Sequence, residues 1–313
     1  MVKVFPTKFQ QLLYLLLVGV LLLTIAIHVL VNPIPAQWQY LFFGVLVLST
    51  GIPHGAVDHL VERQTKALLH TKFSAVRFYI TYLLPMVVYG VAWLIFPTLS
   101  LYYFLYLSAT HFGETDIPLA NQNSNVGRLL PISFGVLMLS TILAFHIPQV
   151  TVMLSELQTF HSSLFTVLRW AYLPVVMVAL PALVFLLVFT LLFAQKQIPI
   201  HVFTRAMLLY VPTSLAAYYL PLLVVFSLYF GLWHSVVSLQ NIRIHLSALR
   251  AKPITWWQLV IQCIPYTVLA FAGIGGFIWL ANIYNSIHTL VLGGFIGIAI
   301  LTLPHSQVMG SMY

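Results

Sequence analysis

Apolar residues along this chain gather in long runs, such as residues 11–31 and 172–193. Each run is long enough to cross a hydrocarbon core of about 30 Å as a helix of about 20 residues. The pattern predicts an all-α fold, a polytopic bundle of about ten transmembrane helices (within a range of eight to ten) in a single domain, residues 1–313. The predicted spans are residues 11–31, 37–53, 76–96, 99–112, 129–147, 172–193, 203–219, 222–239, 256–281 and 287–303.

Two features of this count depend on short segments. Residues 99–112 are few for a full crossing, and almost no loop separates the two spans that meet at Leu220 and Pro221. A single helix over residues 203–239 would be too long for one crossing, and Pro221 disfavours its continuation. The first run is longer than the apolar core of a signal peptide, which is usually about 7 to 15 residues. We therefore interpret it as a true span.

Composition agrees with a membrane protein. Hydrophobic residues make up 61% of the chain and charged residues 6%, whereas roughly a quarter of the residues in a soluble domain are charged. The net charge of +8 does not indicate nucleic-acid binding, because the basic residues form no run with exposed aromatics. Cys263 is the only cysteine, so the chain cannot form an internal disulfide.

The basic residues predict the orientation of the chain, since Lys and Arg collect in short cytoplasmic loops. With the N-terminus inside, the inner segments hold Lys3, Lys8, Arg63, Lys66, Lys72, Arg77, Arg128, Lys196, Arg205, Arg243, Arg250 and Lys252. The outer segments hold only Arg169. This distribution supports ten spans with both termini in the cytoplasm, in the inner (plasma) membrane of a cell.

Four histidines lie at the inner ends of four different even-numbered spans: His54, His111, His234 and His305. Their surroundings read PHGAVD, THFGETD, YFGLWHS and LTLPHS, with Pro before two of them and Gly after two. Such residues suit a locally broken helix that makes room for an ion. Neutral imidazole is the commonest metal ligand in proteins, so four at one predicted depth indicate a metal site near the cytoplasmic side.

Acidic residues lie close to two of these histidines, although the chain has only five carboxylates. Asp58 follows His54 by four residues, and Glu114 follows His111 by three, with Asp116 just beyond. Carboxylates at this distance suit acceptors for the ring N–H of a metal-bound histidine. His59 is open to three interpretations: a further ligand, a partner of a ligand, or the first residue at the lipid headgroups.

The remaining histidines serve as a comparison. A single histidine at a helix end is more often an interfacial or hydrogen-bonded residue than a ligand. Seven others lie outside the motifs of the four candidate ligands, and we interpret them as structural or solvated: His28, His70, His146, His161, His201, His245 and His288.

The motifs GIPHGAVD, HFGETD, YFGLWHS and LTLPH, in this order, resemble those of the Brp/Blh family of membrane-bound β-carotene 15,15′-dioxygenases, found beside microbial rhodopsins. The resemblance extends over nearly the whole chain. It implies a non-haem Fe(II) enzyme that uses O2 to split the central double bond of β-carotene, or of a related carotenoid, into retinal. A rhodopsin that receives the retinal is the implied partner.

The resemblance also implies a ligand set for the iron, in which His54, His111 and His234 match family ligands. The fourth family ligand, the second histidine of an H-x3-H pair, falls on Ser238. Three interpretations follow: a three-histidine site, a fourth ligand from His305 (or His59), or a homologue with lost or altered chemistry. A Ser238→His variant should preserve or raise metal affinity, and a fall would mean that another group already fills the position.

A carotene dissolves in the bilayer, so its enzyme should open a tunnel to lipid. Aromatic residues near the ligand histidines are candidates for its wall, although each is also explained by ordinary packing: Phe112, Tyr229, Phe230 and Trp233. Two other classes of function stay open. A proton or ion transporter would need ionisable residues at several depths, and a metal-free carotenoid or retinal carrier would explain the loss of a ligand at Ser238.

Overall fold

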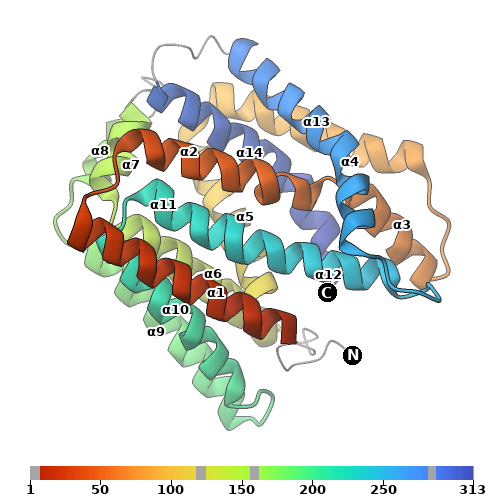
Figure 1. The fold of residues 1–313 in the computed structure, drawn as a ribbon, viewed down its shortest axis with the longest axis horizontal. Coiled ribbons are helices and arrows are strands. Elements are labelled where there is room, and N and C mark those ends of the chain that lie inside the picture. The colour runs from red at the N-terminus through yellow and green to blue at the C-terminus, as the bar shows by residue number, and fades with distance from the viewer. Residues whose placement is uncertain (1–7, 118–124, 156–161, 281–286, 313) are drawn as a thin grey trace. The chain divides into compact units, whose positions relative to one another are not determined.

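The computed structural model describes residues 8–117, 125–155, 162–280 and 287–312. Most of the chain in these ranges is helical, and they contain no β-strand (Figure 1). Lys3 and His161 lie outside the described residues, as does the side chain of His288. The predicted all-α class is confirmed.

The elements of the first half are α1 (Lys8–Ala26), η1 (Ile27–Val31), α2 (Ala36–Leu46), η2 (Val47–Gly51), η3 (Pro53–Gly55), α3 (Asp58–Leu68), α4 (Ala75–Ile95), α5 (Pro97–Asp116), α6 (Asn125–Ala144) and α7 (Ile147–Ser155). Those of the second half are α8 (Ser162–Leu168), α9 (Leu173–Ala194), α10 (His201–Tyr219), α11 (Leu222–Ser227), η4 (Leu228–His234), α12 (Ser235–Ser247), α13 (Trp256–Leu280) and α14 (Ile287–Gly310). Segments η1, η2 and η4 are π-helical, and η3 is a single 3-10 turn.

The chain divides into two compact units. The first comprises Met1–Val47, Ser108–Val150 and Phe165–Val237. The second comprises Leu48–Leu107, Thr151–Leu164 and Ser238–Tyr313. Each unit contains two of the four histidines that the sequence singles out.

The first unit is built around the pairing of α6 with α9, with α1 packed on α10 and α2 on α11. Phe134 of α6 and Phe185 of α9 are fully buried, and their ring centroids are 5.6 Å apart. The end of α5 crosses α6 at a pair of glycines. A Cβ on Gly113 would lie 1.8 Å from the Pro131 carbonyl oxygen, and one on Gly135 would lie 1.8 Å from the Ala109 oxygen. These two helices can approach so closely only because both residues lack a side chain.

In the second unit α14 packs against α4, α13 and α3. Its core includes Val57 and Val61 at the start of α3, Ile242 of α12, and Met309 of α14. Cys263 of α13 is buried in the same cluster. This core holds the turn before α3 against the end of α14, and both segments carry a histidine of interest.

Eight helices among the described residues are long and apolar enough to cross a membrane. The chain is therefore a membrane protein. Two of the ten predicted spans, residues 99–112 and 203–219, fall within α5 and α10, which are helices of 20 and 19 residues but are not among the eight. Both contain charged side chains and several hydroxyls, which lower their hydropathy. The number of spans and the cytoplasmic termini remain predictions.

Candidate metal centre

The first unit brings His111 of α5 next to His234 of η4. Their ring centroids are 4.8 Å apart with the ring planes at 79°, so the edge of one imidazole faces the other. His111 is 2% exposed and His234 is fully buried. Phe112 covers the second ring, with its centroid 4.4 Å from that of His234. Two imidazoles from different helices thus meet in an apolar environment, where nitrogen ligands can bind a metal ion.

His234 ends a π-helical segment, and such segments occur often at functional sites. The hydroxyl of Ser235 donates to the Phe230 carbonyl five residues earlier, and the backbone N–H of Ser235 donates to the same oxygen. Gly231 lies at the closest approach to α2, because a Cβ there would be 2.7 Å from that of Leu46. The glycine of YFGLWHS therefore lets the segment that carries His234 pack against its neighbour.

The second unit brings His54 of η3 next to His305 of α14. Their ring centroids are 4.6 Å apart and the ring planes are at 84°. The Nδ1 atom of His305 lies 2.9 Å from both carboxylate oxygens of Asp58, and the Tyr82 hydroxyl donates to Asp58 Oδ2 over 2.7 Å. Since a carboxylate accepts, Nδ1 of His305 is the donor, and in the neutral imidazole Nε2 then carries the lone pair. This is the arrangement of a carboxylate that orients a metal-binding histidine.

The chain around His54 is broken, as its Pro and Gly predict. A π-helical segment ends at Gly51, Pro53 begins a 3-10 turn, and Val57 leaves helical geometry at φ −110° and ψ 17° before α3 starts at Asp58. Pro53 cannot donate a backbone hydrogen bond, which favours this interruption. Asp58 therefore does not continue the helical face of His54, and its carboxylate contacts His305 instead.

The predicted helix break is wrong for two of the other motifs. Helix α5 is continuous through His111 and Gly113, and α14 is continuous through Pro304 and His305. Gly113 has a packing role, the close approach of α5 to α6.

The other predicted site residues lie as follows. Asp116 is buried and accepts hydrogen bonds from Tyr229 and Trp233. Glu114 is half-buried. The His59 ring packs on that of Tyr266, with centroids 4.4 Å apart. Several of the histidines interpreted as structural bond to backbone or hydroxyl groups, in agreement with that interpretation: His28 to Ile34, His146 to Ile142 and Leu220, and His245 to Thr65.

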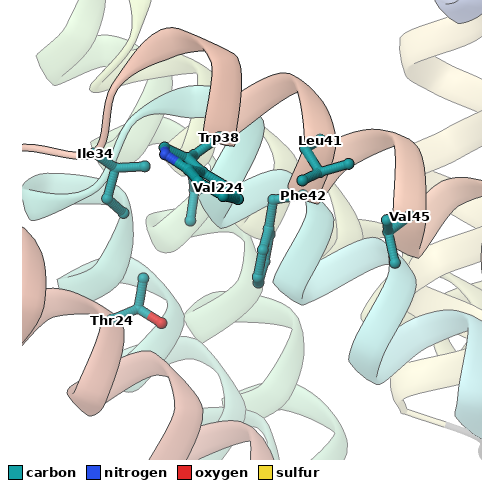
Figure 2. A pocket seen from close by; sticks show the side chains of 7 residues that line it. All are labelled: Thr24, Ile34, Trp38, Leu41, Phe42, Val45 and Val224. Atoms are coloured by element: carbon teal, nitrogen blue, oxygen red, sulfur yellow. The ribbon is translucent and has the colours of Figure 1, made fainter.

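An apolar groove of about 290 Å³ lies in the first unit, between α1, α2 and α11. Figure 2 shows its lining: Thr24, Ile34, Trp38, Leu41, Phe42, Val45 and Val224. The Thr24 hydroxyl donates to the Val20 carbonyl of its own helix. The groove can therefore hold a hydrocarbon. The four aromatic residues predicted for a tunnel wall do not line it; Phe112, Tyr229, Phe230 and Trp233 are all buried.

Comparison with known families decides the assignment. The family described as beta-carotene 15,15'-dioxygenase matches residues 45–313, which include all four histidines and Asp58. The chain belongs to this family. Neither the curated proteins nor the solved structures gave a match. The family resemblance drawn from the four motifs is thus confirmed, and the chain belongs to a group of carotenoid-cleaving oxygenases.

The structure shows the surroundings of Ser238, the residue that departs from the family motif. Ser238 of α12 lies one helical turn after His234 along the chain and is fully buried. Its hydroxyl finds no hydrogen-bond partner among the described residues. A buried hydroxyl of this kind ordinarily has a protein or water partner, so the position where the family has a ligand remains polar in this chain.

Sequence reasoning missed three hydrogen bonds to the carboxylates near the four histidines. Tyr82 is 24 residues from Asp58 and on another helix, and no local pattern joins them. The bonds of Tyr229 and Trp233 to Asp116 could have been anticipated, because the polar tips of buried Tyr and Trp need partners and few polar groups are available in this chain.

Proposed function

We propose that this chain is a carotenoid-cleaving dioxygenase in which His54, His111, His234 and His305 together bind one ferrous ion. The observation that carries the proposal is the pairing of Asp58 with Nδ1 of His305, which orients this buried imidazole so that its Nε2 can serve as a metal ligand. Membership of the dioxygenase family supports the reaction. His305 then takes the position that Ser238 cannot fill.

The residues fit such an ion by their chemistry. All four imidazoles are buried, and nitrogen ligands suit iron. Neutral imidazoles leave the +2 charge of the ion uncompensated, and a four-ligand set leaves coordination positions open. Iron bound there would supply the chemistry that activates O2.

The overall reaction balances without another reductant. The central C=C bond of the carotenoid breaks, each of its carbons gains one oxygen atom from O2, and two aldehydes form. O2 is reduced and the two carbons are oxidised. No general acid or nucleophile is required, so the protein's contribution is to bind the polyene, exclude water and hold the imidazoles.

The substrate class follows from the surroundings of the histidines. Phe112 and Phe230 pack around His234, and an apolar polyene entering from the bilayer would meet aromatic surface beside this imidazole. We propose β-carotene or a related carotenoid as substrate, retinal as product and a rhodopsin as recipient. The metal site faces the cytoplasmic side of the plasma membrane in this proposal.

The test is expression in a carotene-accumulating bacterial host, with iron measured on the same preparation. The cells should lose colour, chromatography should detect retinal, and the purified protein should contain about one iron per chain. His54→Ala and His111→Ala should each abolish iron binding. His70→Asn is the control, because His70 is exposed and its φ of 54° suits Asn. Coloured cells with well-inserted protein would refute the substrate.

Ser238 favours one competing function, a metal-free carrier of carotenoid or retinal. A carrier would purify with bound pigment and without iron, and its pigment content would survive His54→Ala. Iron retained in the wild type and lost in this variant would exclude the carrier.

A further inference from the structure

A buried carboxylate in the first unit joins the two helices that carry His111 and His234. Asp116 is 1% exposed and is the last residue of α5. Its Oδ2 accepts from the Tyr229 hydroxyl over 2.6 Å, and its Oδ1 accepts from the Trp233 indole N–H over 2.9 Å. Both carboxylate oxygens are therefore engaged by one short segment, η4.

The placement of these bonds relative to the histidines is specific. On α5, Asp116 lies five residues after His111, and on η4, Trp233 immediately precedes His234. The hydrogen bonds therefore connect the two chain segments within a turn or so of each imidazole. The ring of Phe112, next to His111 on α5, packs on η4, with its centroid 5.5 Å from that of Tyr229 and 4.4 Å from that of His234.

The segment that donates these two hydrogen bonds, η4, needs support from outside its own backbone. A π-helical turn is rare and less favourable than an α-helical one, so the direction of His234 is not fixed by the backbone of η4 alone. Tyr229 and Trp233 are four residues apart and face the same carboxylate. Two charge-assisted hydrogen bonds of this kind are stronger than neutral ones and hold both ends of the segment.

We propose that Asp116 is a positioning residue, which holds His234 against His111 through Tyr229 and Trp233 and thereby sets the geometry of the metal site. The inference rests on the proposed function, since it assumes that these imidazoles bind one ion. Asp116 touches neither the metal nor the substrate in this role. Tyr229 and Trp233 act here as hydrogen-bond donors, in addition to any contact with the polyene.

The experiment uses cobalt(II) as the probe in the detergent-purified full chain, because its visible spectrum reports ligand geometry. Asp116→Asn keeps the side-chain shape but removes the charge and one acceptor atom. We expect the cobalt affinity to fall on the order of 10-fold, as for other residues that support metal ligands, and the absorption bands to shift. Tyr229→Phe and Trp233→Phe should each produce part of this change.

Non-additivity separates a shared mechanism from independent effects. Because both donors act through one carboxylate, the double variant Tyr229→Phe/Trp233→Phe should match Asp116→Asn, and adding Asp116→Asn to it should change little further. Tyr210→Phe is the matched control. It deletes another tyrosine hydroxyl bond between helices of the same unit, to Thr141 over 3.2 Å, and should leave the cobalt spectrum unchanged even if it lowers stability.

A wild-type protein that binds no cobalt overturns the proposed metal site and this inference with it. If Asp116→Asn binds cobalt with the wild-type affinity and the wild-type spectrum, the inference about Asp116 is overturned and the proposed metal site stands. Should Asp116→Asn fail to fold, Tyr229→Phe and Trp233→Phe are judged by the same criteria. If these variants change the cobalt spectrum no more than Tyr210→Phe does, Asp116 has only a structural role.

Discussion

Asp58 shows how a single buried residue can orient a proposed metal ligand. It is one of five acidic residues in the chain and is only 2% exposed. Burial of a carboxylate is unfavourable unless it is paired and hydrogen-bonded, and here Tyr82 and His305 supply the partners. The same bonds fix the ring orientation and tautomer of His305. The pairing therefore serves both the stability of the buried charge and the direction of a nitrogen lone pair.

Asp58→Asn should weaken metal binding at least about 10-fold, because the amide accepts the Nδ1 proton less strongly and holds the ring less firmly. Tyr82→Phe should give a smaller loss, since it removes only one bond to Asp58. Iron content and cobalt affinity measure both effects. Glu62→Gln is the control on the same helix, because Glu62 pairs with Lys66 at the surface. Equal affinity in Asp58→Asn and Glu62→Gln would contradict the role of Asp58.

Ser238 and His305 allow a paired prediction. If His305 is the fourth ligand, Ser238→His alone should lower iron content, because a second imidazole would crowd a fully buried position. His305→Ala should also lower it, and the combination Ser238→His/His305→Ala should recover part of the loss by restoring the family spacing. Metal analysis of the three proteins is the measurement. A gain in iron from Ser238→His alone would mean that the fourth position is open in this chain.

At the scale of elements, the sequence predicted the helices well and their interruptions less well. The motif around His54 is broken as expected, since Pro53 and Gly55 form a 3-10 turn. Pro304 and Gly113 lie within continuous helices. Gly113 meets a carbonyl that follows it by 18 residues, at Pro131, and such a tertiary contact leaves no trace in local sequence. A Pro or Gly in the sequence does not by itself distinguish a helix break from a close helix–helix contact.

The crossing of α5 and α6 gives a prediction at this scale. Gly113→Ala would place a methyl group 1.8 Å from the Pro131 oxygen, so the helices must separate or α5 must shift next to His111. We expect a loss of thermal stability and a lower iron content. Gly44→Ala, a helical glycine with open space at its Cβ, should be neutral or stabilising by roughly 0.5–1 kcal/mol. Circular dichroism melting in detergent and metal analysis distinguish the two.

For the whole molecule, sequence alone was sufficient to predict the helical class and the family. It also singled out the four histidines that the structure brings together in two pairs. It could not predict the partners of Asp58 and Asp116, because these join residues far apart in the chain. The number of membrane crossings could be predicted only in part. Helices α5 and α10 exist, but their polar residues keep them out of the eight clear candidates, and hydropathy does not decide whether a helix of this kind spans.

The two topologies predict opposite sides for two loops, which makes the crossing number testable. With ten spans and an inner N-terminus, Trp170 lies outside and Gln197 inside. If α5 and α10 do not cross, both loops change sides, and Arg128, Lys196 and Arg205 would move outside, against the positive-inside rule. We therefore expect Trp170→Cys to react with a membrane-impermeant maleimide on intact cells and Gln197→Cys to be protected, both in a Cys263→Ser background. Lys72→Cys is inside in either topology and serves as the protected control. Labelling of Gln197→Cys with protection of Trp170→Cys would establish eight crossings and place α5, with His111, on the outer side of the membrane.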